Sequence, residues 1–289
     1  MSKILEVKNL THTYNAASPI KKDAVCDVSF TIEQGEIVGI IGHTGSGKST
    51  LVQHLNGLLK PTQGKVLFED KDIWENPKKI RNIRSKIGLV FQYPEYQLFE
   101  ETVFKDIAYG PKNMGLDGEE LTHRVEEICK LLNIDSDYFE KSPFDLSGGE
   151  KRRVAIAGVM AMRPQIIVFD EPIAGLDPKG RFDVIKMIED YRNTYDATVI
   201  IISHNMEDMA VLADKLLVMN NGTLAMYGTV YDVFSRGEEL KSMGLNVPIV
   251  TKVMNELRKR GLDVPNNIFT VRDAVDYLYS LRRDGEVCD

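Results

Sequence analysis

Mostly apolar segments alternate along the chain with segments of helical periodicity. Four short segments are almost entirely apolar, as is typical of strands buried on both faces: residues 36–41, 87–91, 166–170 and 198–203. Between them, apolar residues recur at helical spacing in residues 119–132 and 149–160. This alternation predicts an α/β fold built on a parallel sheet.

The two ends of the main pattern depart from this alternation. Residues 5–10 and 25–32 are rich in β-forming side chains and predict strands ahead of the first buried one. Residues 215–227 return to strand spacing around Asn221-Gly222, a turn signal that predicts a hairpin closing the main domain.

Beyond residue 236 the pattern is helical. Two amphipathic stripes follow there: Val250, Val253, Met254 and Leu257, then Val271, Ala274, Val275 and Leu278 after a capping Thr270. Each stripe can pack against its own domain or contact a partner chain, and the pattern leaves both open. We expect a main domain at residues 1–235 and a small C-terminal domain at residues 236–289.

Composition narrows the class of protein. The chain is 43% apolar and 27% charged with a net charge of −7, so it has a globular composition and lacks the positive footprint of a nucleic-acid binder. No apolar run approaches the roughly 20 residues that span a bilayer. Residues 1–10 also lack the apolar run of a secretory signal. We therefore expect a chain that stays in the cytoplasm and has no nucleic-acid partner.

Two smaller features of the sequence do not point to a specific function. A basic cluster within residues 71–86 can be a solvated face or can face phosphate or lipid headgroups. Cys26, Cys129 and Cys288 are too far apart in the sequence for a CxxC pair or a local zinc site, so we expect reduced thiols.

The strongest chemical signal is a glycine-rich loop after the first buried strand. Residues 42–49 fit the pattern G-x-x-x-x-G-K-[ST] and open a predicted helix at residues 48–58. In this arrangement backbone N–H groups point at a triphosphate, Lys48 reaches its β- and γ-phosphates, and the Ser49 hydroxyl ligates Mg²⁺. The predicted ATP contacts in this segment are Gly42, His43, Thr44, Gly45, Ser46, Gly47, Lys48, Ser49 and Thr50.

Two carboxylates end the buried strand at residues 166–170. A charge is unfavourable at the end of a buried strand unless a cation or a reacting water needs it. Asp170 suits the Mg²⁺ shell, whereas Glu171, which points the other way along the strand, suits a general base that polarises the attacking water. The alternative is a strand-end carboxylate that merely faces solvent.

A second anion-binding motif lies about a hundred residues after the loop. Ser147, Gly148 and Gly149, flanked by Leu146 and Glu150, stand at a predicted helix start, where backbone N–H groups can press on a γ-phosphate. With this motif the chain resembles the ABC-type ATPases, a class of P-loop NTPases. The resemblance implies an N-terminal antiparallel β subdomain and a helical subdomain at about residues 93–162. It also implies that each signature motif contacts nucleotide held by a second chain.

Four further positions match that family in the expected order. The resemblance implies that Tyr14 stacks on adenine and that Gln92 contacts Mg²⁺ and the water and senses a transmembrane partner. It implies further that Asp177, in the segment 174–177, crosses the dimer interface and that His204 contacts the γ-phosphate. For Tyr14 an ordinary half-buried tyrosine remains the alternative.

Two positions depart from the family pattern. Glu150 stands where many relatives have glutamine, and Asn205 follows the histidine where an acidic residue is common. Neither removes a group essential to hydrolysis, so we expect a competent site with Glu171 and His204 as its catalytic residues.

Residues 92–113 and the tail segments 245–248 and 258–265 resemble energy-coupling factor transporter ATPases, which energise the import of vitamins or transition-metal ions. Residues 93–101 look most like the second of two paralogous ATPases that pair head to tail. The resemblance implies three kinds of partner: a second ABC ATPase chain, a transmembrane T component and an interchangeable substrate-binding membrane subunit. It places the chain at the cytoplasmic face of the cell membrane as a peripheral protein.

The same stretch suggests a docking surface. Three carboxylates stand beside apolar residues, an arrangement suited to gripping a cationic helix of the T component: Glu95, Glu100 and Glu101 with Leu98, Phe99 and Val103. A solvated acidic loop is the alternative.

Other functions compete with this interpretation. An ordinary ABC importer or exporter ATPase has the same enzyme chemistry with a different membrane partner. A soluble ABC ATPase acting on nucleic acid or the ribosome is disfavoured because the chain has one such loop and no sustained heptads. A small-molecule kinase is disfavoured by the signature motif.

Overall fold

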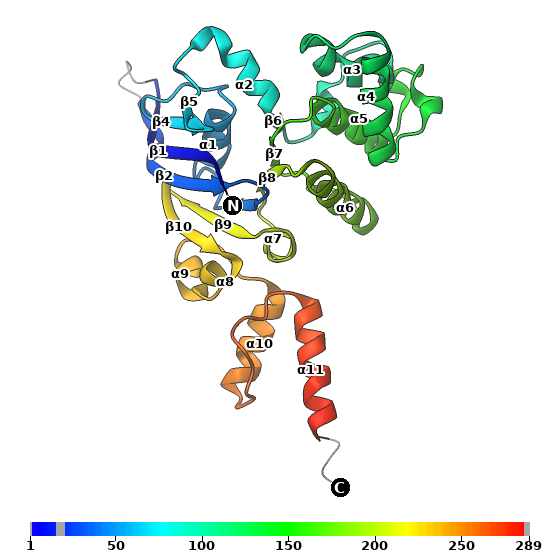
Figure 1. Cartoon of the computed structure of the whole chain (residues 1–289). Helices are drawn as coiled ribbons and strands as arrows, with labels where there is room; N and C mark the ends of the chain where they lie inside the picture. Colours follow the sequence, from blue (N-terminus) through cyan, green and yellow to red (C-terminus); the bar gives the residue numbers. More distant parts are fainter. Residues whose placement is uncertain (1, 16–20, 286–289) are drawn as a thin grey trace.

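The computed structural model describes residues 2–15 and 21–285, and its strands form two sheets (Figure 1). The larger sheet has the order β10-β9-β3-β8-β7-β6, and its five strands from β9 to β6 run parallel. These strands span β3 Ile37–Ile41, β6 Ile87–Val90, β7 Ile166–Asp170, β8 Thr198–Ile202, β9 Lys215–Asn220 and β10 Thr223–Thr229. Every residue of β3 and β8 is buried, which confirms strands covered on both faces.

The smaller sheet is antiparallel and lies on the N-terminal side of the molecule (Figure 1). Its order is β2-β1-β4-β5, with bounds β1 Lys3–Tyr14, β2 Lys22–Glu33, β4 Gln63–Phe68 and β5 Lys71–Asp72. The first two strands confirm the sequence prediction. The short strands β4 and β5 were not predicted, because β4 begins with three exposed residues and has little apolar periodicity.

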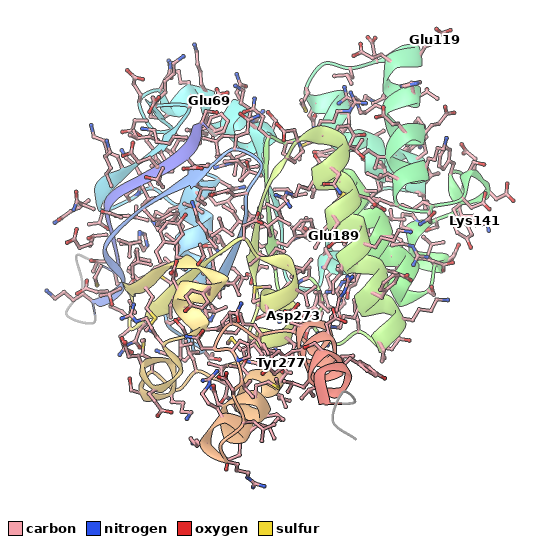
Figure 2. The ribbon with its side chains drawn as sticks, turned by 60° about the horizontal axis from the view of Figure 1, so that its bottom comes forward. Glu69, Glu119, Lys141, Glu189, Asp273 and Tyr277 are labelled. Atoms are coloured by element: carbon pink, nitrogen blue, oxygen red, sulfur yellow. The ribbon has the colours of Figure 1, made fainter. Side chains whose placement is uncertain are left out.

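Three helices form a body to one side of the large sheet, drawn in green in Figure 1: α3 Val103–Asn113, α4 Gly118–Leu131 and α5 Gly148–Met160. Short 3₁₀ turns flank them: η2 Pro94–Gln97 precedes α3, and η3 Ser136–Tyr138 and η4 Pro143–Asp145 lie between α4 and α5. Val125 and Ile128 of α4 are fully buried against this body's core. Figure 2 shows Glu119 at the outer end of α4, on the side away from the two sheets.

The remaining helices of the main body flank the sheets: α1 Lys48–Leu55, η1 Pro77–Lys79, α2 Ile80–Lys86, α6 Pro178–Tyr195 and α7 Met206–Leu212. The predicted basic cluster at residues 71–86 thus falls mainly on η1 and α2. There Arg84 donates to the carbonyl of Gly57, at 3.0 Å, so part of the cluster has a structural role.

The C-terminal part contains α8 Val230–Phe234, α9 Gly237–Ser242, α10 Ile249–Lys259 and α11 Val271–Gly285, the last capped by Thr270 as predicted. Leu240, Leu245 and Val247 still pack in the main core, whereas Met254, Val264, Ile268 and Ala274 form a small core of their own. The separate core therefore begins at α10. The domain boundary at residue 235 stays a prediction.

Part of each amphipathic stripe packs within the C-terminal part of the chain, and part of each is exposed. Val250, Met254 and Leu257 pack in the small core with Ala274, whereas Val253, Val271, Val275 and Leu278 are exposed. On α11, whose Asp273 and Tyr277 are labelled in Figure 2, the Tyr277 hydroxyl donates to the carbonyl of Asp263. The exposed half of the stripes leaves a surface open to a partner.

Within residues 2–15 and 21–285, no helix combines the length and apolarity needed to cross a bilayer. Cys26 is half-buried and Cys129 is buried, and both are free thiols, whereas Cys288 lies outside the described residues. Burial raises the pKa of the Cys129 thiol to about 12, so this cysteine is inert near neutral pH.

Candidate nucleotide-binding site

The predicted site residues gather where parallel strands of the large sheet end. The glycine-rich loop follows β3, Gln92 follows β6, Glu171 follows β7 and His204 follows β8. Because carboxyl ends of parallel strands share one edge of a sheet, these four segments meet at the centre of the molecule (Figure 1).

Close backbone contacts explain the glycines of the loop. Gly47 has φ +102°, and a Cβ added there would lie 2.4 Å from the carbonyl oxygen of Ala24. A Cβ at Gly42 would lie 2.4 Å from the carbonyl oxygen of Met219. No side chain fits at either position, so the loop keeps the tight curl that a phosphate cradle requires.

Lys48 lies across this loop. Its Nζ donates to the carbonyls of Gly42, at 2.7 Å, and His43, at 3.0 Å. Partial burial lowers the pKa of Lys48, and the carboxylates of Glu171 and Asp170 partly offset that shift. The lysine is thus held at the mouth of the cradle, facing the two strand-end carboxylates.

Ser49 and Asp170 lie next to each other. Asp170 is half-buried, and the nearby Ser49 hydroxyl favours its charged form. Burial, together with the nearby charge of Glu171, raises the pKa of Asp170. Oxygen ligands in an environment with excess negative charge are the donor set that Mg²⁺ prefers.

Glu171 is held in an unusual conformation beside His204. Its φ is +53°, and its N–H donates to the carbonyl of Ile202 at 3.0 Å. Both carboxylate oxygens lie 2.9 Å from Nδ1 of His204. The glutamate side chain is 15% exposed and the histidine 74% exposed, so the pair opens toward solvent on the histidine side.

Tyr14 lines a pocket next to the loop. The pocket is formed with residues of the loop and of β2: Lys22, Ala24, Gly45, Gly47, Lys48, Ser49 and Thr50. The Tyr14 hydroxyl lies 3.3 Å from Oγ1 of Thr50, and its ring is partly exposed. The predicted adenine-stacking residue and the predicted phosphate loop therefore share one cavity.

The other predicted residues lie outside this pocket. Gln92 is exposed directly after β6, and Nδ1 of His43 bonds the carbonyl of Thr44, at 2.9 Å, within the loop. Asp177 caps α6 by accepting the N–H of Gly180 at 2.7 Å. Gly149 lines a separate cavity between α5 and α6.

The signature segment forms the start of α5. Ser147 caps this helix in a capping box with Glu150, whose carboxylate accepts the Ser147 hydroxyl at 2.6 Å. Hydrogen bonds from the Ser147 side chain and backbone, and from Tyr138, lower the pKa of Glu150 to about 2. The departure at Glu150 therefore has a structural role: a carboxylate completes the cap.

The set of exposed residues that we predicted for a docking patch at residues 95–103 is partly wrong. Leu98 and Val103 are buried, whereas Phe99 is 57% exposed and stacks edge-on against Tyr109, with ring centroids 4.8 Å apart. Glu101, just before α3, pairs with Lys105 of that helix. A groove nearby is lined by residues of α2, α3, α5 and the segment from η2 to α3, among them Arg81, Arg84, Gln97, Leu98, Phe99, Asp106, Tyr109 and Val159.

Sequence reasoning missed Arg152. This arginine on α5 is only 5% exposed and contacts the loop that carries Glu171. The available signal was a basic residue four positions before the buried Ile156, on the same helix face.

Comparison with known proteins gives one consistent family. Residues 25–174 match the model of the ABC transporter family. The chain is 50% identical over 274 residues to the energy-coupling factor transporter ATP-binding protein EcfA2 of Caldanaerobacter subterraneus subsp. tengcongensis, covering 95% of this chain and 96% of the relative. It is 51% identical over 271 residues to the protein of the same name from Clostridium acetobutylicum, covering 93% and 95%.

Solved structures agree with this result. CbiO1 from Clostridium perfringens, part of the ABC transporter complex cbiONQ, superimposes with a TM-score of 0.75 at 35% identity and covers 88% of this chain and 100% of its own. The ATP-binding cassette MJ0796, in a dimeric post-hydrolysis state with ADP and Pi, gives a TM-score of 0.70 at 27% identity and covers 78% and 99%. The chain therefore belongs to the ABC transporter ATPases, in the family of energy-coupling factor transporter ATP-binding proteins EcfA2, and is the ATP-hydrolysing subunit of such a transporter.

Proposed function

We propose that the strand-end site binds Mg-ATP through the residues predicted from the sequence. Lys48 and the loop N–H groups hold the phosphates, Tyr14 stacks on the adenine, and Ser49, Asp170 and Gln92 hold Mg²⁺. The observation that carries the proposal is the placement of Lys48 and Ser49, in the segment after β3, beside the carboxylates of Asp170 and Glu171 at the end of β7. When bound, Mg²⁺ would neutralise charge on the phosphate oxygens.

Glu171 is the proposed general base. Its carboxylate is mostly buried and bonded to His204, which is the arrangement that orients a base toward a water near the γ-phosphate. His204, the more exposed of the two, then reaches the γ-phosphate itself. The left-handed backbone at Glu171 aims the side chain away from the line of the strand.

The test of this site is Glu171→Gln, which keeps the shape of the side chain and removes the base. We expect unchanged ATP affinity and a fall in turnover of about 10²- to 10⁴-fold, the usual contribution of a positioned base. The measurements are nucleotide binding to the isolated chain and ATP hydrolysis by the complex purified from membranes. Turnover equal to that of the wild type would refute the role of Glu171.

We infer a head-to-tail pair of ATPase chains with one nucleotide at each of two shared sites. Ser147, Gly148 and Gly149 lie outside the pocket that Tyr14 and the loop form, so each signature is free to complete the site of another chain. Asp177, at the start of α6, belongs to the same proposed interface. A paralogous ATPase is the proposed second chain.

The groove beside Phe99 is the proposed docking site for the transmembrane T component. It combines exposed aromatic rings with charges of both signs, and Asp106 holds its rim by accepting the N–H groups of Phe99 and Glu100, each at 2.9 Å. A cytoplasmic helix of the partner that carries arginines would pack against Phe99 and Tyr109 and meet Glu100 and Glu101 at the rim.

Two variants test the groove. Phe99→Ala should lower recovery of the membrane component about tenfold or more, as for an interface anchor, while ATP affinity of the free chain stays unchanged. Charge reversal of Glu100 and Glu101 should weaken assembly in the same way. Phe182→Ala, at an exposed phenylalanine of α6, is the matched control. Full assembly by the Phe99 variant would exclude this groove.

The transported substrates are proposed to be vitamins or transition-metal ions, recognised by a separate, interchangeable membrane subunit. The chain itself then lies at the cytoplasmic face of the membrane, bound through its partners. Affinity purification from detergent-solubilised membranes, followed by mass spectrometry, identifies those partners. Recovery of a second ATPase, one polytopic protein and several small alternative membrane proteins is the expected result. A single dedicated transporter pair would contradict it.

A further inference from the structure

Arg152 is a buried cation at the centre of the molecule. It lies in the second turn of α5, five residues after Ser147, and is 5% exposed. A buried guanidinium is stable only where hydrogen bonds and opposite charge offset the loss of water. Its partners therefore show what it holds in place.

The guanidinium of Arg152 binds the loop that follows β7 through main-chain oxygens. Nη2 donates to the carbonyl of Pro172, at 2.5 Å, and to that of Glu171, at 3.3 Å, and Nη1 donates to the carbonyl of Ala174, at 3.3 Å. One side chain thus spans the loop that carries the proposed base and leads to Asp177.

Few hydrogen bonds other than those of Arg152 hold this loop, and its apolar residues Ile173 and Leu176 pack against the main core. Glu171 has the left-handed φ of +53°, which is unfavourable for a residue with a side chain. Pro172 has no N–H to donate. Apart from Arg152, the loop is held by the bond from Glu171 N–H to Ile202 and by weak turn bonds such as Ala174 N–H to Glu171 at 3.3 Å. His204 holds the Glu171 carboxylate itself, whereas Arg152 holds the main chain from which that side chain projects.

The segment after Gln92 packs on the helix that carries Arg152, through the turn η2. Burial lowers the pKa of Arg152, and the charge of Glu95 in that turn partly offsets the shift. One carboxylate oxygen of Glu95 is buried and has no hydrogen-bond partner among the described residues. Gln97 and Phe99, which follow in the same segment, line the proposed docking groove.

We propose that Arg152 is a positioning residue for hydrolysis: it ties the Glu171 loop to the signature helix, with Glu95 as its charge partner. The segment that faces the membrane component and the loop that carries the base then share one buried cation. A displacement of Glu95 then changes how firmly Arg152 fixes the position of Glu171. This inference rests on the proposed function, in which Glu171 is the base.

The experiment compares Arg152→Lys in two backgrounds. Lysine keeps the charge and presents a single ammonium, which cannot reproduce the planar fork that reaches three carbonyls. In the otherwise wild-type complex we expect kcat to fall about 10- to 100-fold with KM for ATP within about twofold, as for a misplaced catalytic group. In the Glu171→Gln background the same substitution should change the residual rate by less than about threefold, because an effect that acts through Glu171 is non-additive with its removal.

Two further variants complete the design. Arg192→Lys is the matched control, since Arg192 also donates to a carbonyl, that of Gly35, and to a carboxylate, that of Asp214, on another part of the chain. It should leave kcat unchanged. Glu95→Gln should lower kcat by about threefold to tenfold in the wild-type background only, as expected of an indirect coupling. Glu119→Gln, at an exposed carboxylate of α4, is its control.

The outcomes separate the inference from the function on which it rests. An equal loss from Arg152→Lys in both backgrounds indicates a general distortion of α5 and overturns the positioning role. A complex with Glu171→Gln that is as active as the wild type overturns the role of Glu171 and the inference with it. Should Arg152→Lys fold poorly, the Glu95→Gln result decides, and an unchanged kcat there excludes the proposed charge partnership.

Discussion

The edge of the large sheet and the helical body of α3, α4 and α5 are built in different ways. At the sheet edge, Lys48 and His204 follow strands, and Asp170 ends one, whose residues are almost all buried, so their positions are set by backbone pairing. The helical body exposes Tyr96, Phe99 and Tyr109 and joins the sheet through turns. Side chains fixed by buried strands can hold the geometry that catalysis requires, and a helical body that packs separately can move in response to a partner.

The largest expected effect tests the sheet edge alone. Lys48→Ala should weaken ATP binding by about 1.5–3 kcal/mol, roughly 10- to 150-fold, because a hydrogen-bonding charge beside the phosphates is lost. Titration of the isolated chain with a fluorescent ATP analogue measures this loss. Lys65→Ala, on the exposed part of β4, serves as the control. Equal affinities of the two variants would mean that the loop does not hold the phosphates.

The next prediction compares how the contributions of one residue in each region to stability depend on pH. His54 of α1 is buried, with its Nδ1 2.7 Å from the carbonyl oxygen of Thr50 and its Nε2 3.1 Å from Nδ1 of His12, and burial lowers its pKa to about 4. The unfolded chain takes up this proton near pH 6.5, before the folded chain does. The contribution of His54 to stability is therefore full above pH 6.5 and is lost as the pH falls toward 4.

Lowering the pH from 6 to 5 should therefore decrease the free energy of unfolding by about 1 kcal/mol because of this histidine. Urea titrations at both pH values, with His54→Gln for comparison, measure the difference. In the helical body Glu150 behaves differently, since its lowered pKa confines its loss of stability to the range from about pH 4.5 down to about 2. An identical pH slope in the variant and the wild type would contradict the assignment to His54.

The smallest effect tests the helical body. Ser147→Ala removes the cap of α5 and should lower unfolding free energy by about 1 kcal/mol, leaving ATP binding to the free chain unchanged. Thermal unfolding and the same fluorescence titration measure both quantities. Reduced ATP affinity in the free chain would show that the signature belongs to the same site as the loop, and not to that of a second chain.

The parts that the sequence predicted share a short-range cause. The bounds of β7 agree with the apolar run at residues 166–170, and the loop at residues 42–49 follows a buried strand, because glycine spacing and apolar runs encode such elements locally. The predicted hairpin around Asn221-Gly222 is formed by β9 and β10 for the same reason.

The parts that it missed depend on distant contacts. Leu98 and Val103 look like a surface patch beside three carboxylates, yet both are buried because α3 packs on α5. Glu95 likewise acts on Arg152, fifty-seven positions away in the chain, and contributes no charge to the lining of the groove. Neither pairing leaves a periodic signal in the sequence.

The amino-acid sequence by itself thus determined the buried strands of the large sheet and the glycine-rich loop and predicted Glu171 as the base, because each is encoded by adjacent residues. Only the tertiary structure decided that Glu171 adopts a left-handed conformation beside His204 and is held there by Arg152. The physical reason is that a buried charge takes its partners from whichever segments the fold brings around it.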